Sequence, residues 1–429
     1  MKLNKMTILS ALVCSASMAM SGASCAVPGG EVSDAEKASV RPWMLWPRPE
    51  PINLPPLFTE ASGGATVEAW EKTRRPEIMR IFESSMYGER PVGRPDGLTF
   101  TPLAEDKVMM DGQAIRKQVR IGYTGPLGTG GFNVLAYIPV SARTNPAPAF
   151  VLICNRVLDE NADPDRKVRT GFFPAEEIVA RGYAAIIFKN TELAHDEKIH
   201  SLTGGVFAVF GPKERTFRSW GAISAWAWGA SRVMDWIETE RLFDARHVGV
   251  VGHSRGGKTS LWAAATDSRF AMACVNDSGC CGAKLNHASI PMSENIELDN
   301  VVNPHWFCSA FRLCDGRDAF LPFDMHQVAA CIAPRLLAIG SASRDTPAGP
   351  YGEFLTAKLA SPAWELYGLK GLEPDPDMKD KLGHKGFPPC GVAIDAGRVS
   401  YHLREGGHGL TLEDWNIYMD FADRHGWRD

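Results

Sequence analysis

Several patterns that would assign a function at once are missing from this 429-residue sequence. Lysine and arginine total 46 against 50 aspartates and glutamates, so the net charge of −4 provides no basic field for nucleic acid. No cysteines have the C-x-x-C spacing of zinc sites and no H-E-x-x-H motif occurs, so we predict neither a metal nor an organic cofactor. After the N-terminal segment, no run reaches the roughly 18 apolar residues that a membrane-spanning helix needs.

The N-terminus has the composition of an export signal. Two early lysines precede an apolar segment, residues 6–20, and small residues follow up to Cys25. We therefore predict a signal peptide over residues 1–25 and a protein that is periplasmic, secreted, or held at the outer membrane as a lipoprotein. Acylation of Cys25 and plain secretion both stay open, because Gly22 is a poor fit to lipoprotein signals.

The mature chain is predicted to form one domain. Residues 26–66 are rich in proline and irregular, which is typical of a segment that wraps the surface of a domain. Residues 67–429 then form a single catalytic domain, and we expect a monomer.

A strand, a turn and a helix are predicted over residues 247–262. The bend carries the motif G-x-S-x-G, formed by Gly252, Ser254 and Gly256. In α/β-hydrolases this turn is the nucleophile elbow, where glycines permit a strained reversal that exposes the serine hydroxyl. The following helix directs free N–H groups to the same place, where they would stabilise a developing oxyanion. Ser254 is therefore the predicted nucleophile.

The surrounding elements alternate between strands and helices. Residues 114–123 and 132–139 predict an antiparallel hairpin, and a strand–helix rhythm follows from residue 149. This order predicts a three-layer αβα sandwich of the α/β-hydrolase type, with a mostly parallel central sheet and an antiparallel N-terminal hairpin. The further predicted elements are strands at 150–154, 183–188, 270–276, 335–342 and 398–404, helices at 175–181 and 219–239, and two short helices or one kinked helix at 67–86.

The triad partners of the serine should follow it in the order acid, histidine. His408 stands in a Gly-rich loop after the last predicted strand, the position expected for the general base, whereas His402 within that strand is the core alternative. Two carboxylates are candidates for the acid: Asp277 and Asp345 each follow a predicted strand. The sequence leaves both open.

The cysteines allow two interpretations. Export permits disulfides, and a bridge from Cys280 or Cys281 to Cys308 would join two loops beside the elbow. Burial as free thiols within strands is the alternative, and it suits Cys154 and Cys331 as well as the cysteine at position 274.

From about residue 70 to residue 427, the chain resembles the bacterial glucuronoyl esterases of carbohydrate esterase family 15. The motifs that carry the resemblance are Trp220 to Gly229, Gly252 to Lys258, Asn276 to Cys280, Pro304 to Cys308, Leu321 to His326 and Gly352 to Phe354.

The resemblance implies hydrolysis of esters that join glucuronic or 4-O-methylglucuronic acid on xylan to lignin alcohols, through an acyl-enzyme. It implies Arg255 as an oxyanion stabiliser and Lys258, Glu294 and Trp306 as substrate-binding residues. A cation beside the nucleophile and donors one helical turn later suit this chemistry.

One departure from the family pattern affects the substrate. The family has a tryptophan shortly after the second acid, whereas residues 345–350 read Asp-Thr-Pro-Ala-Gly-Pro. Other acyl specificities therefore remain alternatives, namely an acetyl-xylan or cinnamoyl esterase. A serine peptidase and a non-catalytic carbohydrate-binding protein on the same fold are further alternatives.

Overall fold

The computed structural model describes residues 54–212, 214–288, 290, 292–379 and 384–428. The predicted signal peptide, Cys25 and most of the proline-rich segment lie outside the described residues. Within the described ranges, no helix has both the length and the apolar character needed to cross a membrane.

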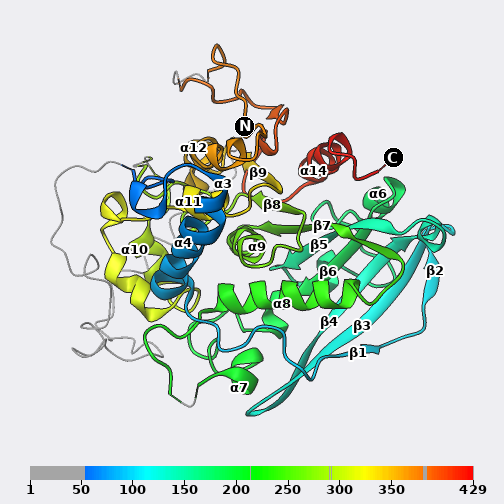
Figure 1. Ribbon diagram of the computed structural model, residues 1–429. Coiled ribbons are helices and arrows are strands. Elements are labelled where there is room, and N and C mark those ends of the chain that lie inside the picture. Colours follow the sequence, from blue (N-terminus) through cyan, green and yellow to red (C-terminus); the bar gives the residue numbers. More distant parts are fainter. Residues whose placement is uncertain (1–53, 213, 289, 291, 380–383, 429) are drawn as a thin grey trace, which may run out of the picture.

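One large sheet forms the centre of the described chain (Figure 1). Its strands follow the order β1-β3-β4-β6-β5-β7-β8-β9-β11-β10, with β2 paired to β3. The strands from β6 to β11 in this order are parallel, whereas β3 and β4 form the predicted antiparallel hairpin. The strands are β1 Thr99–Pro102, β2 Lys107–Met109, β3 Ala114–Gly125, β4 Gly128–Pro139, β5 Ala147–Cys154, β6 Ala184–Lys189, β7 Phe243–His253, β8 Met272–Asn276, β9 Leu336–Ala342, β10 Val392–Ile394 and β11 Val399–Arg404.

Helices cover both faces of this sheet, as predicted (Figure 1). Successive residues of β7 show the arrangement, since Val250 packs in the core under α8 and α9 while Val251 packs in the core under α6 and α14. Because both faces are buried, the central strands are almost continuously apolar. The helices used below are α4 Arg75–Phe82, α6 Ala175–Ala180, α7 Val206–Phe210, α8 Ala222–Ile237, α9 Arg255–Thr266, α10 Ile296–Val302, α11 Met325–Ala330, α12 Pro350–Ala360 and α14 Leu412–Arg424.

The tryptophan-rich helix is part of the core. Trp226, Trp228 and Trp236 on α8, with Trp220 just before it, are each at most 1% exposed. They pack around a helix that lies on the sheet, so they provide no exposed surface on which a sugar could stack. These tryptophans are therefore core residues.

Residues 67–87 form one continuous helical run, in which α4 is flanked by two π-helical segments. Pro76 lies at the start of α4, directly after the first of these π-helical segments. Arg74 from this run binds the carbonyls of Pro56 and Leu57, which holds the end of the proline-rich segment against the domain.

The predicted disulfide is wrong. All eight cysteines of the described residues are free thiols. Cys308 packs in a separate small cluster with Phe217 and Ala310, while Cys280 and Cys281 lie in the turn after β8, with their sulfurs 3.5 Å from each other. The alternative of buried thiols is confirmed, and burial raises the pKa of Cys280 and Cys308.

Candidate active site

The serine at the elbow has a strained backbone. Ser254 lies between β7 and α9 with φ 59° and ψ −126°, and its N–H donates to the carbonyl of Asn276 at 2.9 Å. A Cβ on Gly252 would stand 1.8 Å from the carbonyl oxygen of Gly256, so the turn closes only with glycine at position 252. The strain is therefore built into the motif, as expected of a nucleophile elbow.

The predicted base and one of the two candidate acids are in direct contact. His408 Nδ1 and Asp345 Oδ2 lie 2.6 Å apart, and the carboxylate is 4% exposed. Hydrogen bonds from Ser343 N to Arg404 O and from Arg344 N to Gly406 O join the loops after β9 and β11, so the two side chains meet. A carboxylate only accepts, so Nδ1 carries the proton and Nε2 is left as the acceptor of the ring.

The imidazole of His408 lies beside the elbow. Its ring centroid is 4.4 Å from that of His253, the residue immediately before Ser254. His253 Nδ1 donates to Asn276 Oδ1 at 2.8 Å, which leaves Nε2 to accept from Arg156 at 3.0 Å. Burial, followed by the proximity of His408, holds the pKa of His253 well below its usual value. The ring next to the base is thus neutral.

The second acid candidate has a different partner. Asp277 is 1% exposed, and its Oδ2 accepts from Arg404 Nη2 at 2.9 Å and from Gly409 N at 3.2 Å. One of its carboxylate oxygens lies within 4.8 Å of a carboxylate oxygen of Asp345 and of a ring nitrogen of His408. Burial and the negative charge of Glu353 raise the pKa of Asp277 to about 9, although Arg404 opposes the shift. Both candidates therefore lie at the base, but only Asp345 orients it directly.

Arg404 is a residue that the sequence analysis missed. Its Nη2 donates to the carbonyls of Gly407 and Gly409, on either side of His408, while its Nε donates to Asp414 at 2.9 Å. The side chain is 3% exposed, so these contacts fix the loop from within the protein.

Asp414 links Arg404 to two further side chains near the site. It also accepts from His402 at 2.9 Å and from Asn276 at 3.0 Å. Burial opposes ionisation, but hydrogen bonding and the charges of His402 and Arg404 lower the pKa of Asp414. His402 is thus the core histidine that its position in the strand suggested.

Arg255 lies at the start of α9, as predicted. Its Nη2 donates to Asn155 O at 3.2 Å, and its Nε is ion-paired with Asp196. Asp196 also accepts from His305 and from Trp306 Nε1, both at 2.9 Å. Burial opposes ionisation, but these hydrogen bonds and Arg255 lower the pKa of Asp196. A guanidinium has five N–H groups, so others remain for an oxyanion.

The three predicted substrate-binding residues lie close together: Lys258, Glu294 and Trp306. Lys258 Nζ lies 3.7 Å from Glu294 Oε2, 3.4 Å from Asp299 Oδ2 and 5.6 Å from the ring centre of Trp306. It also donates to the carbonyl of Ser278 at 2.8 Å. Burial favours the neutral amine, but the two carboxylates raise the pKa of Lys258 above its ordinary value. The lysine is 3% exposed, whereas the side chain of Glu294 is 33% exposed.

Glu353 holds the loop after β8 in place. This buried carboxylate accepts from Ser278 N, Ser278 Oγ and Gly279 N at 2.8 to 3.0 Å, and from Ser341 Oγ at 2.6 Å. Burial raises its pKa. The sequence analysis placed it in a family motif but gave it no role, because two of its four hydrogen bonds come from backbone N–H groups 74 and 75 residues away in the sequence.

Two side-chain clusters of the described residues have the composition of a metal site. One consists of Asp277, Asp345 and His408, whose hydrogen bonds are described above. The other consists of Cys280, Cys281 and Asp299, and the ammonium of Lys258 lies beside it. Burial raises the pKa of both thiols, which disfavours the thiolates that a metal requires.

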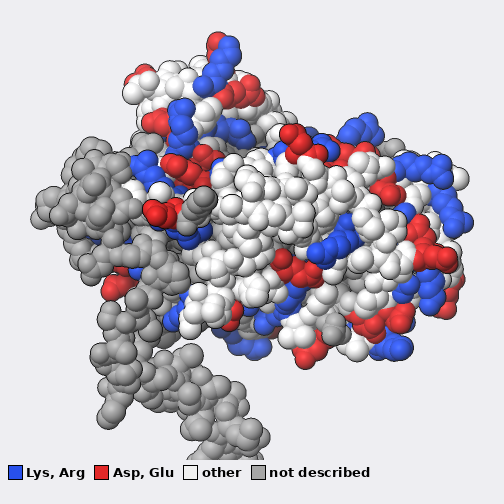
Figure 2. Space-filling model, turned by 90° about the horizontal axis from the view of Figure 1, so that it is seen from below, with Lys and Arg blue, Asp and Glu red and all other residues white. Residues whose placement is uncertain are grey.

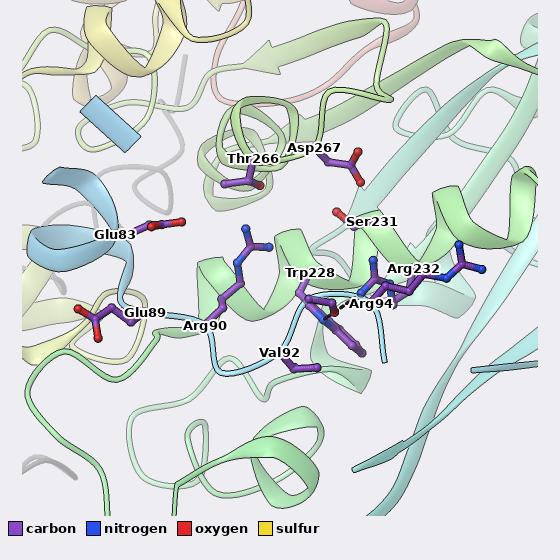
Figure 3. Close-up of a pocket in the computed structure, with 11 residues that line it drawn as sticks. Glu83, Glu89, Arg90, Val92, Arg94, Trp228, Ser231, Arg232, Thr266 and Asp267 are labelled. Atoms are coloured by element: carbon purple, nitrogen blue, oxygen red, sulfur yellow. Dashed lines mark hydrogen bonds between the residues drawn. The ribbon is translucent and has the colours of Figure 1, made fainter. Parts of the chain in front are cut away.

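A cavity of about 360 Å³ lies away from the elbow (Figure 3). It reaches Thr266 at the end of α9, twelve residues from the elbow, which is about 18 Å along the helix. Arg90 and Arg94 line this cavity, and the negative charges of Glu83 and Asp267, which also line it, balance their positive charges (Figure 3). The face seen in Figure 2 likewise mixes both charge signs around a largely uncharged centre in its described part.

Comparisons with known proteins agree with this geometry. A family model described as fungal glucuronyl esterase matches residues 168–368. A carbohydrate esterase from an unknown prokaryotic organism is 32% identical over 406 residues, which cover 88% of this chain and 89% of that protein.

Solved structures give the same result. A glucuronoyl esterase from Solibacter usitatus has a TM-score of 0.77 at 32% identity, covering 88% of this chain and 98% of that one. A family 15 glucuronoyl esterase from Teredinibacter turnerae has a TM-score of 0.74 at 28% identity, covering 87% and 89%. The chain therefore belongs to the glucuronoyl esterases of carbohydrate esterase family 15, which are carboxylic ester hydrolases with an α/β-hydrolase fold.

Proposed function

We propose that the protein hydrolyses esters of glucuronic acid, including its 4-O-methyl form, with Ser254 as nucleophile, His408 as base and Asp345 as the orienting acid. The observation that carries this proposal is the 2.6 Å contact between His408 Nδ1 and Asp345 Oδ2, beside a serine with a strained backbone. The carboxylate sets the tautomer in which Nε2 can take the serine proton.

The reaction proceeds through a covalent intermediate. His408 Nε2 removes the proton of Ser254 as its oxygen attacks the ester carbonyl, and Arg255 with the first N–H groups of α9 stabilises the oxyanion. The alcohol departs with the proton from the imidazolium. Water then attacks the acyl-enzyme with the same base, which releases the uronic acid and restores the serine.

The groups around the elbow suit a uronic acid. Lys258, Glu294 and Trp306 cluster one helical turn beyond the serine, where they provide a cation, a carboxylate acceptor and an aromatic edge. Lys258 acts mainly through Glu294, because its ammonium is buried and already bound to the Ser278 carbonyl. The part-exposed Glu294 is the group that accepts sugar hydroxyls.

A broader acyl specificity is the second candidate function. Pro347 stands two residues after the acid, and this loop lacks the tryptophan of the family pattern. A solved relative at 32% identity is described as a promiscuous family 15 esterase from a marine bacterial metagenome. Loss of one aromatic contact weakens discrimination for the uronate, so acetyl or cinnamoyl esters would then also be cleaved.

We further propose the setting in which the enzyme acts. Residues 1–25 direct export, residues 67–429 form the catalytic domain, and the natural ester joins glucuronoxylan to a lignin alcohol. The family membership and the composition of the N-terminal segment support this proposal.

The test compares benzyl esters of glucuronate and galacturonate with nitrophenyl acetate. We expect the glucuronate ester to have the highest kcat/KM, and Ser254→Ala to lower the rate on every ester about a million-fold. Equal rates on glucuronate and acetate would favour the broader specificity. Unchanged rates in Ser254→Ala, with oligosaccharides still bound, would make the protein a carbohydrate-binding module.

A further inference from the structure

Asp196 lies between the arginine predicted to stabilise the oxyanion and a loop from another part of the chain. Its two carboxylate oxygens have different partners. Oδ2 is ion-paired with Arg255 Nε, whereas Oδ1 accepts from His305 Nε2 and from Trp306 Nε1, both at 2.9 Å. One side chain therefore joins the residue directly after the nucleophile to a loop about 50 residues later in the sequence.

The backbone that carries Asp196 is fixed by the core. Trp226 Nε1 on α8 donates to the carbonyl of Ala194 at 2.9 Å, and Val206 N donates to the carbonyl of Leu193 at 2.8 Å. Leu193 and Ala194 are both fully buried. Asp196 follows two residues after this anchor, so its side chain extends from a backbone with little freedom to move.

The groups that bind Oδ1 of Asp196 are constrained as well. The carbonyls of His305 and Trp306 accept from the first two N–H groups of α8, at 2.9 Å from Ala222 and at 3.2 Å from Ile223. The side chains of this pair are buried. Because both the backbone of the aspartate and its Oδ1 partners are fixed, Oδ2 has a defined position against the guanidinium.

The guanidinium of Arg255 needs a counter-charge in this place. Burial, followed by the positive charge of Arg255, lowers the pKa of Arg156. Burial also lowers the pKa of Lys189, and the charge of Arg255 adds to that shift. Three cations therefore lie near one another, and their repulsion would turn a flexible arginine side chain toward water. The ion pair with Asp196 opposes this repulsion.

The ion pair also determines which N–H groups of Arg255 remain for the substrate. Nε is paired with Asp196 and Nη2 donates to Asn155 O at 3.2 Å, whereas Nη1 has no hydrogen-bond partner among the described residues. A guanidinium is planar, so fixing Nε and Nη2 also fixes the direction of Nη1. A donor with a fixed direction stabilises an oxyanion without first having to reorganise.

We propose that Asp196 is a positioning residue, which holds Arg255 in the orientation that stabilises the oxyanion. The inference rests on the proposed function, since it requires Arg255 to bind the oxyanion. Asp196 acts through the arginine and not on the substrate. Its replacement should therefore lower kcat and leave KM nearly unchanged, because the oxyanion develops only after the substrate is bound.

Asp196→Asn breaks this contact selectively. The amide oxygen can still accept from His305 and Trp306, which places the amide nitrogen against Arg255 Nε, so that two donors face each other. We expect kcat on benzyl glucuronate to fall about ten- to thirtyfold with KM within about twofold, which is part of the roughly 10²- to 10³-fold loss caused by removing an oxyanion donor. Asp196→Glu, which moves the carboxylate by one methylene, should lower kcat by a similar factor.

The matched control is Asp244→Asn. Asp244 also pairs with an arginine and a histidine, Arg246 and His247, and its side chain is 19% exposed against 13% for Asp196. It lies at the start of β7, at the opposite end of that strand from the elbow. Its replacement should therefore leave kcat unchanged.

A double-mutant cycle with Arg255→Met tests whether Asp196 acts through the arginine. Arg255→Met alone should lower kcat about a hundredfold or more. In that background, Asp196→Asn should cause no further loss, because the group that it positions is already absent. A merely structural role of Asp196 would give the same loss of kcat in both backgrounds.

Each contrary result has a defined meaning. An unchanged or higher kcat in folded Asp196→Asn would overturn the inference, since the carboxylate would then only screen the guanidinium charge. So would an equal loss in both backgrounds, or the failure of both Asp196 variants to fold, as judged by circular dichroism. A wild-type kcat in Arg255→Met would overturn the oxyanion role in the proposed function and the inference with it. A loss in Arg255→Met with none in Asp196→Asn would overturn the inference alone.

Discussion

Replacing each of the two acids by asparagine separates their roles. In Asp345→Asn, the amide nitrogen can donate to His408 Nδ1, which moves the ring proton to Nε2. That tautomer cannot accept the serine proton, and the corresponding change in serine hydrolases lowers kcat about 10⁴-fold. Because the contact here is short and the carboxylate is buried, we expect a loss of about 10³ to 10⁴-fold.

Asp277→Asn should have a much smaller effect. Burial and neighbouring carboxylates raise the pKa of Asp277 to about 9, so near neutral pH the native group is mostly an uncharged acid. An amide oxygen can still accept from Arg404 and Gly409. We expect kcat to stay within about tenfold of the wild type, since no charge facing the imidazolium is lost.

The assay is kcat on a glucuronate ester at pH 7, with circular dichroism to establish that both variants are folded. Asp345→Ala with Asp277 intact is a further control, because it tests whether the second carboxyl replaces the first. A larger loss in Asp277→Asn than in Asp345→Asn would refute the assignment of Asp345.

Other consequences follow from the same contacts. Gly252→Ala should abolish folding or activity, measured by expression and circular dichroism, because its Cβ would collide with the Gly256 carbonyl. Arg404→Lys should lower kcat at least tenfold with little change in KM, whereas Arg335→Lys, at a half-buried arginine that binds carbonyls elsewhere, should lower stability alone. The raised pKa of Asp277 means that the folded state holds a proton which the unfolded state loses above about pH 4. Stability should therefore fall by at most about 1.4 kcal/mol per pH unit up to pH 9, and urea unfolding of Asp277→Asn at pH 5 and pH 8 should show that this decline is reduced.

Much of the fold could be predicted because its signals are local. Apolar runs such as β5 and β7 mark strands buried on both faces, and the G-x-S-x-G motif marks the turn between a strand and a helix. At residues 67–87 the structure has one continuous helical run, where the sequence predicted two short helices or one kinked helix. Proline normally kinks or ends a helix, and the π-helical segment directly before Pro76 leaves no pattern in the composition.

The contacts that organise the site were not local. Asp196, Arg404 and Glu353 each act on groups more than 50 residues away or on backbone atoms, and neither kind of contact leaves a spacing pattern. Lys258 shows the same limit, because three available donors suggested sugar binding. Only the fold reveals that the Ser278 carbonyl and two carboxylates already surround its ammonium.

The division of labour between the two acids has an electrostatic cause. Arg404 lies between Asp277 and Asp414, and its single charge can balance only one of two buried carboxylates. Asp414 also accepts hydrogen bonds from His402, Asn276 and Thr411. These favour its ionised form, and its pKa falls. The proton consequently stays on Asp277. Asp345, the strand-end acid in direct contact with His408, is therefore the group placed to stabilise the imidazolium.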